Sequence, residues 1–420
     1  MDNPVQPAIL PDMRTDSDIL IVGGGLNGPA LALALAQGGL TVTVIDALPE
    51  PTRKSDAFDG RSYALALASM RLLKAVGVWQ GVAAQAQPIL DIVTSDGRAG
   101  EGPAPFFLEF PNGELEEGPM GYMLEDRFLR QAMLEAIAAE PRITTLSGET
   151  VTGQAPDATG LTVTLASGKT LRGRVLVGCD GRRSGVAERA GIRRTGWDYG
   201  QTALVCAISH EKPHNGTAHQ FFMPAGPLAI LPLPGHRSSI VWSETHRNAA
   251  TIQALDEAGY LSALRPRFGD FLGDIALEGK RFSYPLNLTL ANAYVAERVA
   301  LVGDAAHGVH PIAGQGLNLG LRDVGALAEV LVDSRRRGED FGMLNVLSRY
   351  QEWRRFDTTV LAAGTDAINK LFSSDNPLLR LGRDLGMGAL NVLPGLRRRF
   401  IREAAGLTGD LPRLMKGRPL

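Results

Sequence analysis

The sequence predicts an α/β protein with a second, mostly β-sheet region and a helical C-terminal tail. Residues 19–22 and 299–302 are short apolar runs, each followed by a glycine-rich loop and then by apolar residues at helical spacing. This order is typical of buried parallel strands that lead into helices. Residues 197–290 instead contain short strand-like runs separated by turns, and the chain ends in amphipathic helical segments.

The composition indicates a globular protein. The chain has 420 residues, of which 44% are hydrophobic and 21% charged, so it is long enough for two domains and a sizeable core. A net charge of -2 and the lack of interleaved basic and aromatic motifs argue against nucleic acid as a partner. Cys179 and Cys206 provide neither a disulfide framework nor metal-ligand spacing, so we expect no metal site and a reducing compartment.

The N-terminus predicts where the protein works. Residues 1–18 lack the basic start and apolar core of a signal peptide. No apolar run reaches the roughly 20 residues that span a bilayer. We therefore expect a cytoplasmic protein, with peripheral contact to the inner face of the cytoplasmic membrane left open.

The first motif follows the strand at residues 19–22. Gly23, Gly25 and Gly28 form the pattern GxGxxG between this strand and a helical run. Such a turn lets the backbone approach a pyrophosphate at the start of a helix. Asp46 ends the next strand, 18 residues after Gly28, where it can accept hydrogen bonds from adenosine ribose hydroxyls. The fingerprint does not separate NAD from FAD, and a purely structural glycine turn is the alternative.

The second motif follows the strand at residues 299–302. Gly303 and Asp304 end the strand, and a loop leads to apolar residues at helical spacing, so we expect a helix to start near Gly316. Glycines before a helix allow close approach of a ligand, and the helix start favours negative charge. The sequence therefore predicts an anion site, against the alternative that Asp304 only caps a turn.

A third motif and two arginines complete the set of candidates. Asp180 and Gly181 follow a buried strand, although an Asp-Gly turn is also a common way to end one. Arg61 lies in a segment at residues 59–79 in which Leu65, Met70 and Leu73 are expected to line one helix face, and Arg127 starts another helix. The alternative for Arg61 is a solvated surface position.

The ordered motifs and the C-terminal segment closely resemble the ubiquinone-biosynthesis hydroxylases, a branch of the FAD-dependent aromatic monooxygenases with a para-hydroxybenzoate-hydroxylase-like fold. The resemblance spans residues 18–414. It implies that Asp304 binds the ribitol of FAD and that the following loop faces the flavin ring. The catalytic residues that it implies are His310, Pro311, Gly314 and Gln315. The cofactor-binding residues are Gly23, Gly25, Gly28, Asp46, Arg61, Arg127, Asp180, Gly303, Asp304, Gly316, Leu317 and Asn318.

The sequence departs from the family pattern after Asp180. Family members contact both FAD and the nicotinamide donor through this motif, which usually continues to an arginine at the position of Ala187. Arg182, Arg183 and Arg189 are the candidates to replace it. A guanidinium in this place would form charge-assisted hydrogen bonds with anionic groups.

The resemblance also implies the division of the chain and a cavity between the two domains. The candidate wall residues are Phe221, Phe222, Leu231, Pro232, Leu233 and Trp242, with ordinary core packing as the alternative for each. The predicted domains are a Rossmann-like FAD-binding domain at 17–87, 123–196 and 291–366, a substrate-binding β-sheet domain at 88–122 and 197–290, and a C-terminal helical tail at 367–420.

The activity that the resemblance implies is hydroxylation of the aromatic ring of a polyprenylphenol in ubiquinone biosynthesis. FAD, reduced by NAD(P)H or another reductant, would react with O2 to give a flavin hydroperoxide that attacks the ring. The alternatives are a hydroxylase of a small soluble aromatic acid, a flavin-dependent reductase of isoprenoid double bonds, and a non-catalytic flavoprotein scaffold in a biosynthetic complex.

The C-terminal segment is basic. Residues 368–402 contain seven basic and two acidic residues, a net charge of +5. Arg397, Arg398 and Arg399 lie beside apolar residues, as in a helix on an anionic membrane or against a partner of the biosynthetic complex. A solvated helix face is the alternative.

Overall fold

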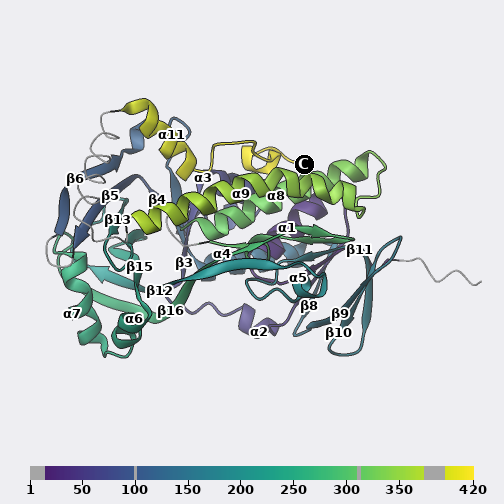
Figure 1. Cartoon of the computed structure of the whole chain (residues 1–420), viewed down its shortest axis with the longest axis horizontal. Helices are drawn as coiled ribbons and strands as arrows, with labels where there is room; N and C mark the ends of the chain where they lie inside the picture. The colour runs from purple at the N-terminus through teal and green to yellow at the C-terminus, as the bar shows by residue number, and fades with distance from the viewer. Residues whose placement is uncertain (1–14, 99–101, 310–313, 373–392) are drawn as a thin grey trace, which may run out of the picture.

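The predicted α/β fold class is confirmed by a computed structural model of the chain, which describes residues 15–98, 102–309, 314–372 and 393–420. The described residues form two eight-stranded sheets and one three-stranded sheet (Figure 1). Helices α8 and α9 pack side by side over the first sheet, and the second sheet lies toward one end of the molecule.

The first sheet has parallel strands at its centre. Its order is β17-β18-β11-β1-β2-β8, and β9 and β10 extend it from β11. Strand β11 pairs in parallel with β1 and β18, and β2 pairs in parallel with β1 and β8, so the carboxyl ends of these strands share one edge. Ligands of open α/β sheets bind at this edge. The strands are β1 (Ser17–Val22), β2 (Val42–Asp46), β8 (Ile143–Ser147), β9 (Val151–Pro156), β10 (Leu161–Leu165), β11 (Thr170–Gly178), β17 (Val295–Ala296) and β18 (Val299–Leu301).

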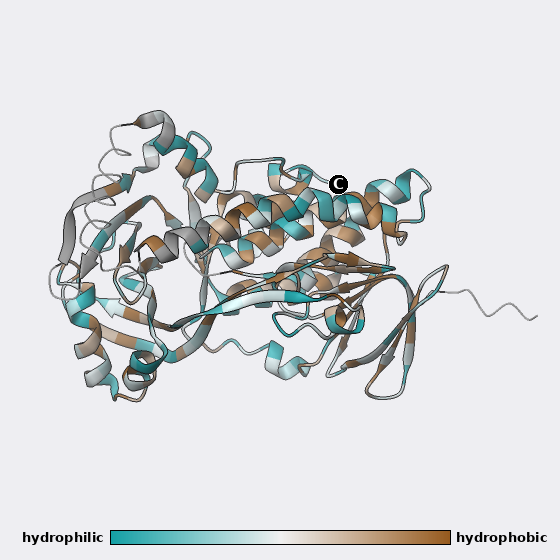
Figure 2. Ribbon diagram, viewed as in Figure 1, coloured by the Kyte–Doolittle hydropathy of each residue, from teal (hydrophilic) through white to brown (hydrophobic). Residues whose placement is uncertain are grey.

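Helices cover the first sheet and share its core. Leu31 on α1, Ile45 on β2 and Leu327 on α8 are fully buried in one hydrophobic cluster. Figure 2 shows hydrophobic residues concentrated in the sheet and on the helices packed against it. The helices are α1 (Asn27–Gln37), α2 (Glu50–Arg53), α3 (Leu67–Ala75), α4 (Asp126–Ala139), α5 (Gly185–Arg189), α8 (Gln315–Arg336) and α9 (Leu344–Phe372), with short 3-10 turns at Trp79–Gly81, Ala83–Gln85 and Gly303–Ala305.

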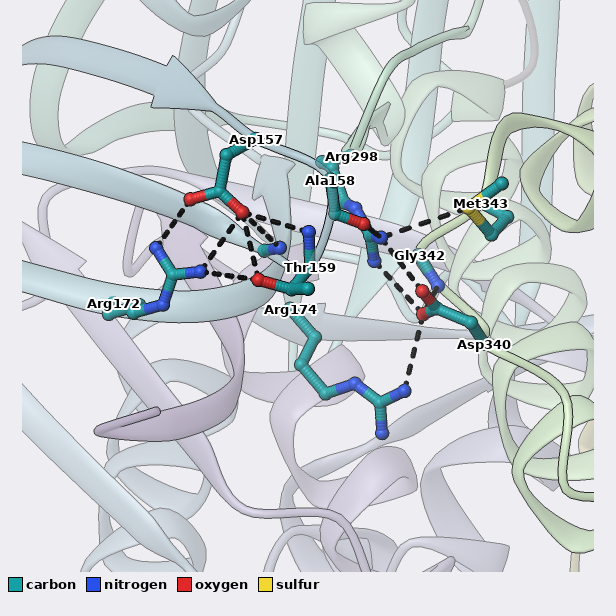
Figure 3. Close-up of polar contacts among 10 residues, drawn as sticks. Asp157, Ala158, Thr159, Arg172, Arg174, Arg298, Asp340, Gly342 and Met343 are labelled. Atoms are coloured by element: carbon teal, nitrogen blue, oxygen red, sulfur yellow. Dashed lines mark hydrogen bonds and ion pairs between the residues drawn. The ribbon is translucent and has the colours of Figure 1, made fainter. Parts of the chain in front are cut away.

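A polar cluster fixes the start of β18. The Arg298 guanidinium, fully buried, donates to both carboxylate oxygens of Asp340, at 2.9 and 2.7 Å. It also donates to the carbonyl oxygen of Ala158 in the turn between β9 and β10, and Arg174 on β11 reaches Asp340 at 3.2 Å (Figure 3). The cluster ties this turn and the α8–α9 connection to the strand that carries Gly303 and Asp304 at its far end.

The three-stranded sheet corrects one prediction. Leu65 lies in strand β3, not on a helix with Met70 and Leu73, which do lie on α3. Strand β3 pairs with β7, and the Asn318 side chain on α8 hydrogen-bonds the strand backbone on both sides of Leu65. These tertiary contacts outweigh the helical propensity of an Ala- and Leu-rich segment. The strands are β3 (Ser62–Ala66), β4 (Gln87–Ile89) and β7 (Gly121–Glu125).

The second sheet is mostly antiparallel and has the order β19-β16-β12-β15-β14-β13-β5-β6. Its long strands β12 and β16 run back to the first sheet, where β16 pairs with β19 in the loop after Asp304. The strands are β5 (Asp91–Arg98), β6 (Gly102–Phe110), β12 (Arg194–His210), β13 (Thr217–Phe222), β14 (Leu228–Leu233), β15 (Arg237–Thr245), β16 (Ile275–Ala291) and β19 (His307–Gly308). Two helices, α6 (His246–Gln253) and α7 (Glu257–Phe268), and a 3-10 turn at Asn112–Glu114 accompany it.

The two faces of the second sheet pack differently. Phe221 and Trp242 belong to a cluster with Tyr260 and Leu264 of α7, so ordinary core packing accounts for these two of the predicted wall residues. Leu233 lies in another cluster with Met123 of β7, and Leu231 packs against it. The face opposite the helices is therefore the one that meets the three-stranded sheet.

The predicted boundary between the first domain and the C-terminal tail, at residue 366, falls inside a helix. Helix α9 continues past it to Phe372. Helix α11 (Pro394–Ala404) and a 3-10 turn at Arg413–Lys416 follow, and the last turn packs against α3 and α8. With the strands grouped as above, we propose that the predicted division into two discontinuous domains and a tail holds. None of the helices in the described part of the chain is long and apolar enough to cross a membrane.

Candidate cofactor site and active site

The first glycine loop is tightly packed except at one position. Gly23 has φ 109°, and a Cβ there would lie 2.3 Å from the carbonyl oxygen of Cys179. A Cβ on Gly28 would lie 2.0 Å from the carbonyl oxygen of Gly23. A Cβ on Gly25 would meet no atom within 4 Å. Gly23 and Gly28 thus let the loop and α1 approach β11, and Gly25 faces open space suited to a ligand.

Asp46 stabilises this loop. Its carboxylate accepts hydrogen bonds from the backbone N–H groups of Gly24, at 2.5 Å, and Leu48, at 2.7 Å. Arg53 on α2 is buried beside it and donates to the carbonyl oxygen of Gly24 at 3.1 Å and to the Ser147 hydroxyl at 3.3 Å. The sequence does not single out Arg53, because no local pattern distinguishes a buried arginine from a surface one.

Asp180 and Gly181 lie beside the first loop. One carboxylate oxygen of Asp180 accepts from the backbone N–H of Val186 at 3.1 Å. The other, Oδ1, is buried and has no hydrogen-bond partner among the residues that the structure describes. Gly181 has φ 78°, and a Cβ there would meet no atom within 4 Å. A buried acceptor without a donor costs free energy, so this oxygen is suited to a ligand hydroxyl.

Gly303 and Asp304 start the next loop. Gly303 has φ 63°, and a Cβ there would lie 2.3 Å from the side-chain nitrogen of Asn27 at the start of α1. The motif therefore requires glycine, and the contact brings the second motif against the first. The Asp304 side chain is 42% exposed and forms an ion pair with Arg182 at 3.2 Å.

The start of α8 is the third element of the site. Gly314 precedes the helix with φ 63°, and the helix begins at Gln315, one residue before the predicted position. A Cβ on Gly316 would meet no atom within 4 Å, and Leu317 is half-buried. Asn318 donates to the carbonyl oxygen of Ala64 at 2.8 Å, so its side chain joins α8 to β3. The predicted catalytic residues His310 and Pro311 lie outside the described residues.

The two arginines predicted to bind the cofactor have partners within the protein. Arg61 contacts Asp59 at 2.7 Å and Asp126 at 3.3 Å. Arg127 contacts Glu125 at 2.8 Å and stacks over Phe128. Both guanidinium groups would have to share or exchange these contacts to reach a phosphate, so their roles stay predictions.

A buried ion-pair network supports the Gly303 loop. Asp323 on α8 accepts from the backbone N–H of Gly303 at 3.0 Å, from His307 Nε2 at 2.5 Å and from Arg354 Nε at 2.7 Å. All three side chains are at most 1% exposed. Burial acts to raise the pKa of Asp323, but His307 and Arg354 oppose it and hold the pKa below its usual value. Asp323 is thus an anion that fixes the backbone immediately before Asp304.

The residues present fit a dinucleotide cofactor. Glycines from all three motifs, Gly25, Gly181 and Gly316, border open space at the carboxyl edge of the parallel sheet. Two buried acceptor atoms that have no partner in the described part of the chain, Asp180 Oδ1 and Asn27 Oδ1, lie in the same motifs. Within the described ranges, no group of His, Cys, Asp or Glu could hold a metal ion. The fold and the site define a dinucleotide-binding protein of the α/β class.

Comparison with known proteins identifies the family. A family profile for the FAD binding domain matches residues 16–355. The ubiquinone hydroxylase UbiL of Rhodospirillum rubrum is 47% identical over 407 residues, covering 96% of this chain and 94% of that protein. The 3-demethoxyubiquinol 3-hydroxylase of Escherichia coli is 36% identical over 394 residues, covering 93% and 99%. The chain belongs to the FAD-binding family that contains the ubiquinone-biosynthesis hydroxylases, as the resemblance predicted.

Solved structures support the same fold. The crystal structure of p-nitrophenol 4-monooxygenase PnpA from Pseudomonas putida matches with a TM-score of 0.78 at 20% identity, covering 94% of this chain and 99% of that one. The predicted cofactor, FAD, is confirmed by the family.

Proposed function

We propose that this protein is an FAD-dependent monooxygenase that hydroxylates the aromatic ring of a polyprenylphenol intermediate of ubiquinone biosynthesis. The observation that carries the proposal is the convergence of three motifs, at Gly25, Asp180 and Asp304, on one edge of the parallel sheet. The identity to UbiL over nearly the whole chain supports the reaction and the substrate class. The reductant is NAD(P)H or another electron donor, and O2 is the second substrate.

The residues of the site have separate roles in this proposal. Gly25 and the start of α1 bind the pyrophosphate, and Asp46 holds the loop and accepts from the adenosine ribose. Asp304 accepts from a ribitol hydroxyl. The start of α8 at Gly316 directs its positive dipole end and free N–H groups toward negative charge on the flavin ring. Bound and reduced, FAD supplies the oxygen activation that ring hydroxylation requires.

The second sheet provides the substrate side. Its face opposite α6 and α7 carries small and apolar residues, among them Ala207, Leu231 and Leu233, and it meets the three-stranded sheet. We propose that the aromatic ring lies between this face and the start of α8, where protein excludes bulk water. Exclusion of water favours transfer of oxygen to the ring over its loss as peroxide.

Oxygen consumption and product analysis test the function. We expect the FAD-loaded protein with a reductant and a short-chain polyprenylphenol to consume O2 and to yield a product heavier by one oxygen atom. Turnover of 4-hydroxybenzoate but not of the polyprenylphenol would favour a small aromatic acid as substrate. Saturation of an isoprenoid double bond would indicate a reductase, and no turnover with any of these substrates would favour a scaffold.

We also propose a peripheral contact between α11 and an anionic membrane, where a lipid-tailed phenol would partition. Fewer arginines of this helix are unpaired than the sequence predicts, because Arg397 forms an ion pair with Glu114 and Arg402 with Glu117. Arg398 and Arg399 are exposed next to Phe400, which is itself 46% exposed. Each basic residue near anionic lipid contributes about 1 kcal/mol of binding free energy, and salt weakens it.

Vesicle sedimentation tests the membrane contact. We expect an Arg398→Glu, Arg399→Glu double variant to bind vesicles containing anionic lipid less than the wild type at low salt, with a smaller difference at high salt. Arg337→Glu and Arg349→Glu are the matched controls, because these arginines are exposed on the α8–α9 side and pair with Glu339. Equal sedimentation of all variants would argue against membrane binding, and the basic residues of α11 would then contact another protein or solvent.

A further inference from the structure

Arg182 lies where three segments of the chain meet. Its Nε donates to Asp304 Oδ2 at 3.2 Å, and one terminal nitrogen donates to Asn287 Oδ1 on β16 at 2.9 Å. The other terminal nitrogen donates to the carbonyl oxygen of Val309 at 3.4 Å. The guanidinium therefore joins the Asp180-Gly181 motif to the Gly303-Asp304 motif and to the second sheet.

The surroundings of Arg182 hold it in this place. Its carbonyl oxygen accepts a hydrogen bond from the Arg194 guanidinium, which fixes the backbone. Gly308 leaves room for the side chain, because a Cβ there would lie 3.3 Å from Arg182 Nε. Three acceptors in different directions match the planar fork of an arginine and cannot all be reached by one lysine ammonium.

Of the three candidate arginines, Arg182 contacts Asp304, whereas Arg183 is exposed. Ala187, at the position where the family usually has an arginine, is fully buried and its backbone N–H bonds to Ser184, so a long charged side chain has no room there. Arg189 is directed toward Gln154, at 3.3 Å, on β9. Arg182 is the one of the three that hydrogen-bonds Asp304, the predicted ligand of the ribitol.

We infer that Arg182 is a positioning residue for FAD: it holds Asp304 through Oδ2, so that Oδ1 is free to accept from a ribitol hydroxyl. Among the described residues, Oδ1 of Asp304 has no partner. Asn287 and Val309 keep the guanidinium in the orientation that fixes the carboxylate. This inference rests on the proposed function, in which FAD occupies the site.

Reconstitution of the protein with FAD tests the inference through a double-mutant cycle. FAD affinity is measured by quenching of flavin fluorescence for the wild type, Arg182→Met, Asp304→Asn and the double variant. We expect each single change to weaken FAD binding by roughly 10-fold to 100-fold, the range for loss of a charge-assisted hydrogen bond. The double variant should bind FAD as weakly as Asp304→Asn alone, within about twofold, because Arg182 acts through Asp304.

Three further measurements separate positioning from a general structural role. Arg189→Met, in the same segment, should bind FAD like the wild type, and the thermal midpoint of Arg182→Met without FAD should be unchanged within about 2 °C. Arg182→Lys should recover part of the affinity only. Wild-type affinity in Arg182→Met, or multiplied losses in the double variant, would overturn the inference. Failure of the wild type to bind FAD would remove the proposed function instead.

Discussion

Arg354 on α9 donates to Asp323 on α8 at 2.7 Å, and neither side chain has any exposed surface. The same carboxylate binds the backbone N–H of Gly303 at 3.0 Å. One buried anion thus connects the two long helices to the loop that presents Asp304. The position of Asp304, the predicted ligand of the ribitol, therefore depends on residues of α8 and α9 outside its own loop.

Removing the carboxylate should destabilise the protein. In Asp323→Ala, the Arg354 guanidinium stays buried without its partner, and loss of one member of a buried ion pair costs about 3–5 kcal/mol. Thermal unfolding should show a clear decrease in Tm. Arg337→Ala, which removes a surface pair with Glu339, should leave Tm unchanged. Equal Tm values for Asp323→Ala and the wild type would contradict a supporting role for the network.

Substitutions at two glycines of the first loop should have different effects, one on FAD affinity and the other on stability. Gly25→Val adds a side chain to space with no protein atom within 4 Å, so the protein should keep its Tm in the absence of FAD but bind FAD at least roughly tenfold more weakly. Gly28→Ala places a Cβ 2.0 Å from the carbonyl oxygen of Gly23 and should lower Tm itself. Retained FAD affinity in Gly25→Val would show that the cofactor lies elsewhere.

His219 makes stability depend on pH. Burial lowers its pKa to about 4, and its ring packs 4.7 Å from that of Phe271. Histidine in an unfolded chain titrates near 6.5. Between these pH values the unfolded chain binds a proton that the folded protein does not, so the free energy of unfolding decreases as pH falls from about 6.5 to 4. His219→Leu should show a shallower decrease over this interval in denaturant titrations, and parallel profiles would argue against it.

Asp304 should be required for tight FAD binding. Asp304→Ala removes the acceptor for a ribitol hydroxyl, and a buried hydroxyl left unpaired costs roughly 1–3 kcal/mol. The protein should therefore lose yellow colour during gel filtration at low concentration, whereas the wild type should retain it. Asp333→Ala is a suitable control, because Asp333 also pairs with an arginine, Arg413, but at the far end of α8. If Asp304→Ala retained FAD as well as the wild type, Asp304 would not be the ligand of the ribitol.

The sequence was sufficient for the local parts of the site. Periodicity and glycine spacing located β1, β2, β18 and the start of α8 to within one or two residues, because these signals depend on neighbours along the chain. The segment around Leu65 predicts a helix. It forms a strand because it pairs with β7 and because the Asn318 side chain hydrogen-bonds its backbone.

The sequence does not predict contacts between residues that are far apart along the chain. Arg182 and Asp304 are 122 residues apart in the sequence, and Arg354 and Asp323 are 31 apart. No local pattern indicates such a pair, since an arginine that ends in a buried network looks like any other arginine in the sequence. Arg53 was missed for the same reason.

The central claim is that this chain transfers an oxygen atom from O2 to an aromatic ring. The most direct test is turnover of a short-chain polyprenylphenol by the FAD-loaded protein under isotopically labelled O2 in ordinary water, with mass analysis of the product. We expect a ring-hydroxylated product that carries one labelled oxygen atom. An unlabelled hydroxyl group, or O2 consumption that yields only hydrogen peroxide, would contradict it.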